Sequence, residues 1–317
     1  MKKIYAAFRR VALSLGYLHK HPQMPIFSSG ELPPEFCSKT YRSLYKDVAH
    51  FSEGKLRNHY FATGRREGRR AYPFSSRLEF AQQFPVNKSV LEISPFTSPF
   101  FIGPNVEYAD VLDQDALRHR ALSLSLDPDD IPKISYVISP TSPSSTVGKK
   151  FDIIASSHVI EHQPNLLGHL REISMLLKQF GQYALVIPDK RYCFDHFISE
   201  TTVAQLLQAD LENRSTHSLS SVIEHAALTT HNDPARHWAG DHGDPVVVLD
   251  KVKKATQEYQ DADGDYIDVH SCYFSPDSFV NLIDLTRDLS FHNFRVQAIY
   301  PTERNNLEFY VVLQRMD

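Results

Sequence analysis

Short apolar runs alternate with helical patterns from residue 88 onward. The runs predict five buried strands, at 88–93, 106–111, 134–138, 151–156 and 183–187. Between residues 166 and 177, apolar side chains recur three and four positions apart, which is the spacing of an amphipathic helix. Strands that alternate with helices in this way predict a parallel sheet covered by helices on both faces.

The end of the chain has a different pattern. Residues 276–289 predict a helix with Ser275 as its N-cap, and two strands follow at 294–300 and 307–313. The turn between these strands is short, and a short turn can join only antiparallel neighbours. We therefore expect an antiparallel strand at the end of the sheet, which a nicotinamide-binding Rossmann domain normally lacks.

Two segments precede this alternation. Residues 1–20 place apolar side chains at helical spacing among lysines and arginines, which predicts a basic amphipathic helix. Such a helix could lie on an anionic membrane surface or in an assembly complex, and the alternative is that it docks on its own protein or on a dimer mate. Residues 34–70 predict two or three short helices. We expect a helical module and linker over 1–70 and a main domain over 71–317.

Composition limits the classes of function. Of the 317 residues, 42% are apolar and 23% charged, as in ordinary soluble globular proteins. The 34 basic and 38 acidic residues give a net charge of -4, so nucleic acid is not an expected partner. The three cysteines are far apart and form no CxxC pair, which fits a reducing cytoplasm. No run reaches the roughly 18 to 20 apolar residues of a membrane span, and we expect a cytoplasmic protein.

The residues that follow each strand are the ones to examine, because ligands of open parallel sheets bind beyond the carboxyl ends of the strands. The first strand leads into residues 92–99, which contain no glycine where a dinucleotide enzyme has GxGxxG. A pyrophosphate needs glycine for close backbone approach, so a nucleoside without phosphates fits this loop better than NAD or FAD. Asp110 follows the second strand, where a carboxylate can bind ribose hydroxyls. The alternative for this acidic stretch is that Asp113 caps a helix over 116–124.

The fourth and fifth strands carry the most specific motifs. FDIIASSHVIEH at 151–162 and LLKQFGQYALVIPD at 176–189 are similar to class I S-adenosylmethionine-dependent methyltransferases. A narrower resemblance, to a methyltransferase group encoded with bacterial O-antigen and capsule genes, is carried by EISPFTSP at 92–99, NVEYADVLD at 105–113, IPDKRYCFDHF at 187–197 and DVHSCYFSPDSF at 268–279. The group usually has glycine where Ser94 stands, and Gln179 and Phe180 replace its usual Pro and first Gly.

The segment 34–70 has a resemblance of its own. It is similar to a small helical module found beside glycosyltransferase and methyltransferase domains of bacterial surface-polysaccharide assembly. The residues that carry this likeness are Tyr41, Tyr45, Asp47, Val48, His59, Tyr60, Gly64, Glu67, Gly68 and Arg69. The family usually has Pro where Lys46 stands, and a generic helical bundle that covers a sheet edge is the alternative.

The resemblance implies a fold, a cofactor and the residues that hold it. The fold is a Rossmann-like α/β sheet of seven strands, the last antiparallel, with an N-terminal helical extension and an insert over 190–273 after the fifth strand. The cofactor is S-adenosyl-L-methionine, which would lie across the first loop. The implied cofactor-binding residues are Glu92, Ser94, Phe96, Asp110, Ser156 and Ser157.

The acceptor side should hold the proton-transfer groups. An O-methyltransferase aligns the acceptor oxygen with the methyl carbon, and for a weakly acidic sugar hydroxyl a general base is expected. Histidines and carboxylates are the candidates. The candidate catalytic residues are His158, His270, Asp189 and Asp195. The candidate substrate-binding residues are Glu161, Lys190, Arg191, His196, Trp238 and Asp268.

Several of these residues have structural alternatives. His158 and His162 are one helical turn apart and could share a helix face and bind a metal, but we expect no metal, and His162 could be a structural residue at a helix start. The charged run that begins at Asp189 could be a solvated face. The insert should form a lid or specificity wall over the acceptor. Within it, Trp238 and nearby histidines could stack on a sugar, or Trp238 could anchor the insert's own core.

Together these features predict an S-adenosylmethionine-dependent O-methyltransferase that acts on a sugar of a bacterial surface polysaccharide or of its precursor. It would be peripheral to the inner face of the membrane if the N-terminal helix binds there. One alternative is a catalytically silent methyltransferase-like protein that binds glycan or serves as a scaffold. A second is a metal hydrolase, which irregular spacing disfavours; its ligands would be His225, His231, His237 and His242.

Overall fold

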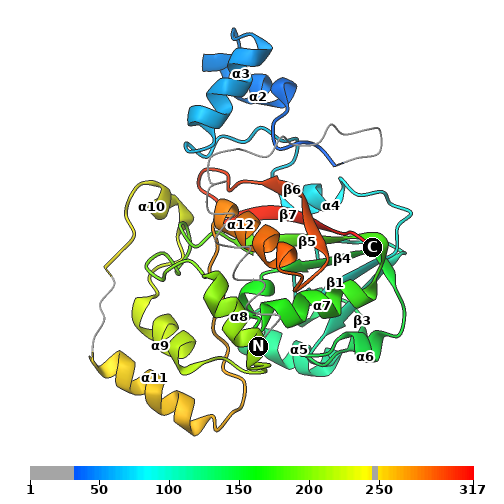
Figure 1. The fold of residues 1–317 in the computed structure, drawn as a ribbon, viewed down its shortest axis with the longest axis vertical. Coiled ribbons are helices and arrows are strands. Elements are labelled where there is room, and N and C mark those ends of the chain that lie inside the picture. Colours follow the sequence, from blue (N-terminus) through cyan, green and yellow to red (C-terminus); the bar gives the residue numbers. More distant parts are fainter. Residues whose placement is uncertain (1–31, 245–248) are drawn as a thin grey trace. The chain divides into compact units, whose positions relative to one another are not determined.

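The structure is a computed structural model that describes residues 32–244 and 249–317. The amphipathic helix predicted for residues 1–20 lies outside these residues. Residues Pro33–Asp317 form one compact unit, in which helices flank a central sheet (Figure 1). The domain boundary that we expect after residue 70 stays a prediction.

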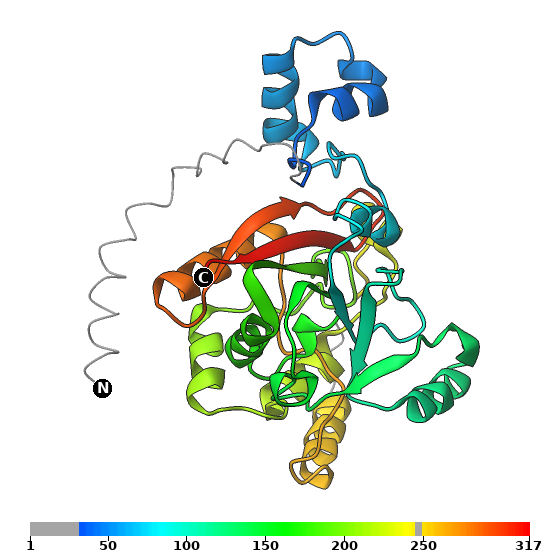
Figure 2. The same cartoon turned by 90° about the vertical axis from the view of Figure 1, so that its right-hand side faces the viewer.

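The sheet has seven strands in the order β3-β2-β1-β4-β5-β7-β6. The strands are β1 (Val90–Ile93), β2 (Val106–Asp110), β3 (Ile134–Val137), β4 (Phe151–Ser157), β5 (Leu177–Pro188), β6 (Phe294–Tyr300) and β7 (Glu308–Arg315). β1 to β5 pair in parallel, and β7 lies antiparallel between β5 and β6. Figure 2 shows β7, in red, beside β6. This arrangement confirms the predicted Rossmann-like methyltransferase fold with its antiparallel last strand.

One predicted strand is much longer in the structure. β5 begins at Leu177, which pairs with Phe151 of β4, whereas the apolar pattern indicated a start at residue 183. The intervening residues 178–180 are exposed, so they have no apolar alternation that could reveal a strand. Phe180 has a φ of 57°, and the register shifts at this point. The early part of β5 is therefore a separate pairing joined to the main strand through an irregular turn.

One face of the sheet is covered by three helices, α7 (Leu166–Leu176), α8 (Val203–Leu211) and α12 (Pro276–Asp288). Alternate β5 residues, Tyr183, Leu185 and Ile187, lie in the core beneath them. The residues between them, Ala184 and Val186, are buried as well, so both faces of β5 are covered, as in a parallel sheet packed on both sides. α12 begins at the predicted N-cap Ser275, whose side chain accepts the backbone N–H of Ser278.

The other face is packed with aromatic rings. Phe74, Phe80, Tyr300 and Tyr310 contact one another with ring centroids 4.7 to 6.1 Å apart. Phe80 belongs to α4 (Arg77–Ala81), a short helix that the apolar pattern did not predict. At the β3 edge of the sheet, α5 (Gln114–Ser123) packs on a single turn at Pro128–Asp130, and α6 (Ser144–Val147) leads into β4.

The N-terminal part of the unit contains the short helices predicted for 34–70. They are α2 (Ser38–Leu44) and α3 (Glu53–His59), with a 3-10 turn at Lys46–Val48 and a π turn at Tyr60–Gly64. A small core of its own includes Tyr41, Leu56 and Tyr60. The turn at residues 65–68, which follows these helices, packs tightly, because a Cβ on Gly68 would lie 2.6 Å from Trp238 Cη2 and 2.7 Å from the Arg304 nitrogen.

The insert after β5 is mainly helical. It consists of α8, α9 (Leu219–Leu228), α10 (Pro234–Trp238) and α11 (Leu249–Asp261), and α9 packs on α11. The chain then returns in extended form, and Lys190 N–H donates to the Phe274 carbonyl at 2.9 Å. The insert therefore leaves and rejoins the sheet at one place, the carboxyl end of β5.

Candidate functional site

Glu92 shapes the loop after β1. Its side chain is buried on the aromatic face and accepts the backbone N–H groups of Phe100 at 3.1 Å and Phe101 at 2.9 Å. Burial raises the pKa of Glu92 to about 7, although these two N–H groups lower it. This predicted cofactor residue therefore folds the first loop back over the end of its own strand.

The loop makes its tight turn without glycine. Ser94 and Phe96 have φ angles of 52° and 44°, in the left-handed region that glycine prefers. Each such residue costs about 1 kcal/mol of strain. The Ser94 N–H donates to the Ala109 carbonyl at 2.8 Å, which holds the turn against β2. The loop therefore makes this turn with serine at position 94.

Asp110 stands at the end of β2, beside this turn. Its buried carboxylate accepts the Leu112 N–H at 3.1 Å, and the Ser94 side chain lies within hydrogen-bonding reach of it. Burial raises the pKa of Asp110, against the lowering effect of Leu112 N–H and Arg120. Asp113 is the N-cap of α5 and accepts the Ala116 N–H at 2.8 Å. Because Asp113 takes the capping role, the Asp110 side chain is not used as a helix cap.

The two serines at the end of β4 differ in their surroundings. Ser156 Oγ lies 2.8 Å from the Tyr183 hydroxyl, which in turn lies 3.0 Å from His169 Nε2, and all three side chains are buried. The Ser156 hydroxyl is thus committed to a network under α7, on the helix side of the sheet. Ser157 Oγ is buried and has no hydrogen-bond partner among the described residues. Of the two predicted cofactor contacts among these serines, only the Ser157 hydroxyl makes no hydrogen bond to the described residues.

His158 does not share a helix face with His162. It follows β4 with a φ of 54°, and only a 3-10 turn over Ile160–His162 comes next, so the helical turn that we expected between the two histidines is wrong. His158 Nε2 lies 2.8 Å from Glu308 Oε1, and Glu308 also pairs with Arg77. Burial raises the pKa of Glu308, but His158 and Arg77 together lower it to about 2. His158 is therefore held in an ion-paired group.

His270 and Asp195 form a buried pair. His270 Nδ1 lies 2.7 Å from Asp195 Oδ2, and the side chains are 6% and 2% exposed. The two residues come from opposite ends of the insert and meet only because it closes on itself. A carboxylate on Nδ1 fixes the imidazole so that Nε2 carries the lone pair, which is the arrangement of oriented bases and of metal-binding histidines. Two of the four candidate catalytic residues are thus brought together.

Glu161 and His162 border this pair. The His162 ring lies edge-on to the His270 ring, with centroids 4.5 Å apart. His162 Nδ1 is 3.2 Å from Asp268 Oδ1, and Asp268 also pairs with Arg120 of α5 at 3.0 Å. Glu161 is fully buried, and its carbonyl accepts the Ser271 N–H at 2.8 Å. The segment after β4 is therefore tied directly to the segment that carries His270.

Polar atoms without partners concentrate around this cluster. Nine buried side-chain nitrogen or oxygen atoms of the described residues have no hydrogen bond, and all but Arg70 Nε belong to Ser157, Glu161, His162, Asp195, His217 and His225. Native proteins leave few such atoms, because each costs free energy of burial. A small pocket of about 90 Å³ adjoins the cluster; its lining includes His217, Glu224, Ser271 and Cys272.

Two residues of this region were not predicted. His217 has both ring nitrogens buried without partners, and burial lowers its pKa to about 4. Arg120 joins the cluster through Asp268 and lies 6.0 Å from the Phe96 ring. The high density of histidine in the insert was the only sequence signal for His217. There was no sequence signal for Arg120, since it occupies an ordinary polar position of a surface helix.

The charged run after β5 is largely tied up within the protein. Asp189 is fully buried and accepts Arg191 Nε at 2.9 Å and the Thr302 hydroxyl at 2.6 Å. Lys190 Nζ donates to the His196 carbonyl at 2.8 Å. Both Asp189 oxygens are occupied, so the geometry does not favour the proposed role of Asp189 as a base. These residues fix the start of the insert.

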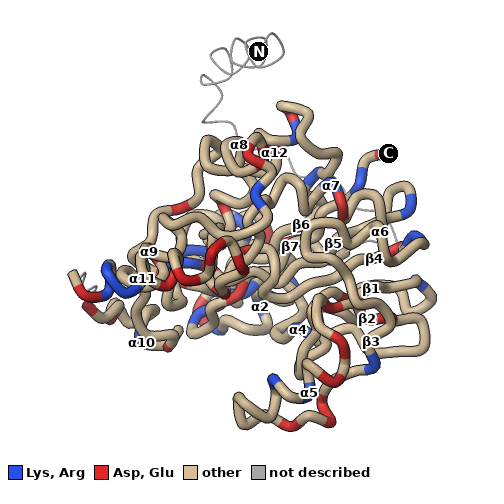
Figure 3. Tube along the Cα trace, turned by 90° about the horizontal axis from the view of Figure 1, so that it is seen from below, with Lys and Arg blue, Asp and Glu red and all other residues tan. Residues whose placement is uncertain are grey.

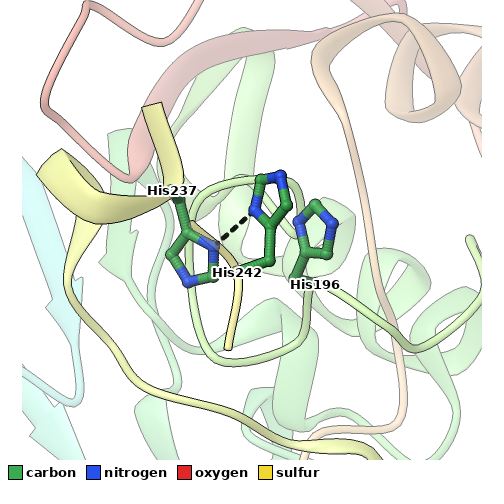
Figure 4. A group of neighbouring side chains, drawn as sticks. All are labelled: His196, His237 and His242. Carbon is green, nitrogen blue, oxygen red and sulfur yellow. Dashed lines mark hydrogen bonds between the residues drawn. The ribbon is translucent and has the colours of Figure 1, made fainter. Parts of the chain in front are cut away.

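Trp238 packs against the protein. Its ring stacks on Tyr192 with centroids 3.8 Å apart, and its Nε1 donates to the Asn306 carbonyl at 2.9 Å. These contacts agree with the interpretation of Trp238 as an anchor of the insert. Nearby, His196 stacks on His242 at 3.6 Å, and His237 Nδ1 lies 3.0 Å from His242 Nδ1 (Figure 4). These three histidines thus pack on one another.

Acidic and basic positions are interspersed along the trace in the view of Figure 3. Among the described residues, no helix is both long and apolar enough to cross a membrane.

No family model and no curated protein match the chain. Among solved structures, it is similar to the glycopeptide N-methyltransferase MtfA complexed with sinefungin, with 16% identity over 37% of this chain and 56% of that chain and a TM-score of 0.26. The trans-methyltransferase CalH complexed with SAH has 10% identity, over 75% and 54%, and a TM-score of 0.37. A possible histamine N-methyltransferase from Thermotoga maritima has 13% identity, over 86% and 100%, and a TM-score of 0.34.

The match spans just over half the length of each of the first two structures, 56% and 54%. At TM-scores below 0.5 these likenesses carry no argument about activity. The fold assignment rests on the strand order and on the antiparallel β7.

Proposed function

We propose that this protein is an S-adenosylmethionine-dependent methyltransferase that methylates a sugar hydroxyl of a bacterial surface polysaccharide or of its precursor. The observation that carries the proposal is the buried Asp195–His270 pair, with Glu161 and His162, at the carboxyl edge of a seven-stranded methyltransferase-like sheet. The polysaccharide part rests on the sequence resemblance alone.

The loops after β1 and β2 would hold the donor. Asp110 would accept hydrogen bonds from the ribose hydroxyls, as a carboxylate does at the end of a second strand. Ser94 and Phe96 would border the methionine part, which carries no phosphate and does not need a glycine-rich loop. When bound, S-adenosylmethionine supplies an activated methyl group, so the chain has to orient the acceptor and exclude water.

The acceptor would enter beside the cluster of Glu161, His162 and His270. Its hydroxyl proton must leave as the methyl group arrives, and these groups are placed there to promote that loss. Asp195 positions His270 through the 2.7 Å hydrogen bond to Nδ1. His158 is less suited to this task, since both of its ring nitrogens lie near carboxylates, Nε2 2.8 Å from Glu308 Oε1 and Nδ1 3.5 Å from Glu161 Oε1.

Calorimetry with S-adenosylhomocysteine tests the donor site. The unaltered chain should bind it, and Asp110→Ala should lose binding by at least tenfold. Asp113→Ala is the matched control, because removing this N-cap should cost about 1 kcal/mol of stability and leave binding unchanged. Absence of binding by the unaltered chain would favour the silent, scaffold-like alternative.

Turnover tests the acceptor side. With labelled S-adenosylmethionine and a panel of nucleotide-linked sugars, His270→Ala should bind S-adenosylhomocysteine normally and slow methyl transfer by about 10²-fold or more. His158→Ala should slow it less. Full turnover by His270→Ala on the best acceptor would contradict the proposed site.

A further inference from the structure

We propose that Glu161, His162 and His270 form a binding site for one divalent transition-metal cation, with Zn²⁺ as the reference ion. One ligand atom from each residue lies within 4.8 Å of the other two. Two imidazoles and one carboxylate are a ligand set that zinc-class cations use when further positions stay open for a substrate.

The distances allow the site to close with small side-chain rotations. A tetrahedral cation about 2.0 to 2.1 Å from its ligand atoms needs those atoms about 3.3 Å apart. The His162 and His270 rings meet at 86°, so their in-plane lone pairs can point to a common position. The backbone supports this arrangement, since Ser271 and Cys272 donate N–H groups to the Glu161 carbonyl at 2.8 and 3.1 Å.

Glu161 supplies an independent observation that points to a ligand. The residue is fully buried, and neither carboxylate oxygen has a hydrogen bond. His158 Nδ1 is 3.5 Å from Oε1, but the pair lacks hydrogen-bond geometry. A buried carboxylate without a partner is costly, whereas coordination to a cation would compensate its charge and satisfy its oxygens.

Both histidines have a carboxylate behind them. Asp195 lies 2.7 Å from His270 Nδ1, and Asp268 lies 3.2 Å from His162 Nδ1. In metal sites, such outer carboxylates fix the tautomer and the ring orientation, so that the other nitrogen faces the metal. The structure provides this support for His270, whose Nδ1 is hydrogen-bonded to Asp195, whereas the Asp268 carboxylate lies near His162 Nδ1 without hydrogen-bond geometry.

A second group of three histidines is less suited. His196, His237 and His242 also bring ligand atoms within 4.8 Å, but the His196 and His242 rings stack at an interplanar angle of 10° (Figure 4). Lone pairs in parallel planes do not converge on one point. This group therefore supplies a matched control.

The consequence for catalysis rests on the proposed function. A cation with open positions would bind the acceptor hydroxyl and lower its pKa. The O–H bond then breaks and its proton passes to water, while the electron pair of the O–H bond stays on oxygen and forms the new bond to the methyl carbon. The S–CH₃ electron pair stays on sulfur, which changes from a sulfonium to a neutral thioether. No oxidant or reductant is needed.

The test uses the full chain, stripped with a chelator and titrated with Zn²⁺ alone in a calorimeter, with elemental analysis of the product. We expect one equivalent per chain, lost in the near-isosteric Glu161→Gln and in His162→Ala, and kept in His242→Ala. Asp195→Asn should weaken binding by about 10- to 100-fold. Circular dichroism of each variant checks the fold.

Cobalt gives a readout that does not depend on any variant. The stripped chain loaded with Co²⁺ should show the visible absorption bands of a low-coordinate site with imidazole ligands. No bound equivalent, or binding that survives Glu161→Gln but is lost in His242→Ala, would overturn the inference. If the chain binds S-adenosylhomocysteine but no metal, this inference alone is refuted. If it binds metal but no S-adenosylhomocysteine, the proposed donor site alone is refuted.

Discussion

Two buried glutamates, Glu92 of β1 and Glu308 of β7, show how hydrogen-bond partners decide the sign of a pKa shift. Glu92 has only backbone N–H donors, and burial raises its pKa to about 7. Glu308 is also buried, but His158 and Arg77 lower its pKa to about 2. Direct hydrogen bonds from His158 and Arg77 outweigh desolvation at Glu308, whereas two peptide N–H groups and the charge of Arg77 do not outweigh it at Glu92.

Glu92 should make stability depend on pH. Its folded pKa of about 7 exceeds the ordinary value of 4.5, so the unfolded chain loses this proton first as the pH rises. The free energy of unfolding should therefore fall between pH 4.5 and 7, by up to about 3 kcal/mol from this residue. Urea unfolding at pH 5 and pH 8 measures the fall, which Glu92→Gln should reduce and the exposed Glu53→Gln should not. An equal fall in Glu92→Gln would contradict the assignment.

Ser94 should tolerate glycine but not a branched residue. Its φ of 52° is strained for a β-branched side chain, so Ser94→Val should cost more than about 1 kcal/mol and weaken S-adenosylhomocysteine binding. Ser94→Gly should retain the fold and most of the binding. Ser98→Val in the same loop serves as a control, because Ser98 is exposed and is not among the residues with positive φ. Unchanged stability in Ser94→Val would rule out this account of the turn.

At the scale of elements, the insert is attached to the carboxyl end of β5 at both of its ends. The residues that flank it, Asp189 and Phe274, pair with each other, and Trp238 of the insert contacts Tyr192 and Asn306. The sequence predicted the insert and the side of the sheet on which it acts. It could not predict these attachments, because each joins residues far apart along the chain through side chains that look like ordinary surface positions.

Trp238→Ala should loosen the insert. The loss of the 3.8 Å stack and of the indole hydrogen bond should cost roughly 2 to 4 kcal/mol, with donor binding unchanged. Limited proteolysis should then cut within residues 190–273 sooner than in the unaltered chain. Trp238→Phe keeps an aromatic stack and should be cut at an intermediate rate. Identical cleavage of all three proteins would show that Trp238 does not anchor the insert.

At the scale of the whole molecule, local patterns predicted most of the fold and less of the site. The individual strands, their parallel pairing and the antiparallel ending followed from apolar periods and turn lengths, which depend on near neighbours, whereas the seven-stranded methyltransferase-like sheet was implied by the resemblance. The His158–His162 helix was wrong because a left-handed residue ends β4 at that point. The full burial of Glu161 has no local signal, since it arises only when the insert folds back over β4.

Gly68 tests how the N-terminal helices join the rest of the unit. It has a φ of 70°, and a Cβ there would lie 2.6 Å from Trp238 and 2.7 Å from the Arg304 nitrogen. Gly68→Ala should therefore lower the free energy of unfolding by more than about 2 kcal/mol. Gly54→Ala, in α3 with nothing within 4 Å, should raise it by up to about 1 kcal/mol. Equal effects in urea unfolding would remove Gly68 from this role.

The position of Gly68 also limits how the chain can be recombined. Residues of the N-terminal helices, the insert and the β6–β7 turn meet where no side chain is present. A chimera that exchanges residues 33–70 for another helical bundle must supply a glycine in the same left-handed conformation at this place. Otherwise the graft will push against Trp238, and a change made at the N-terminal end will displace the insert.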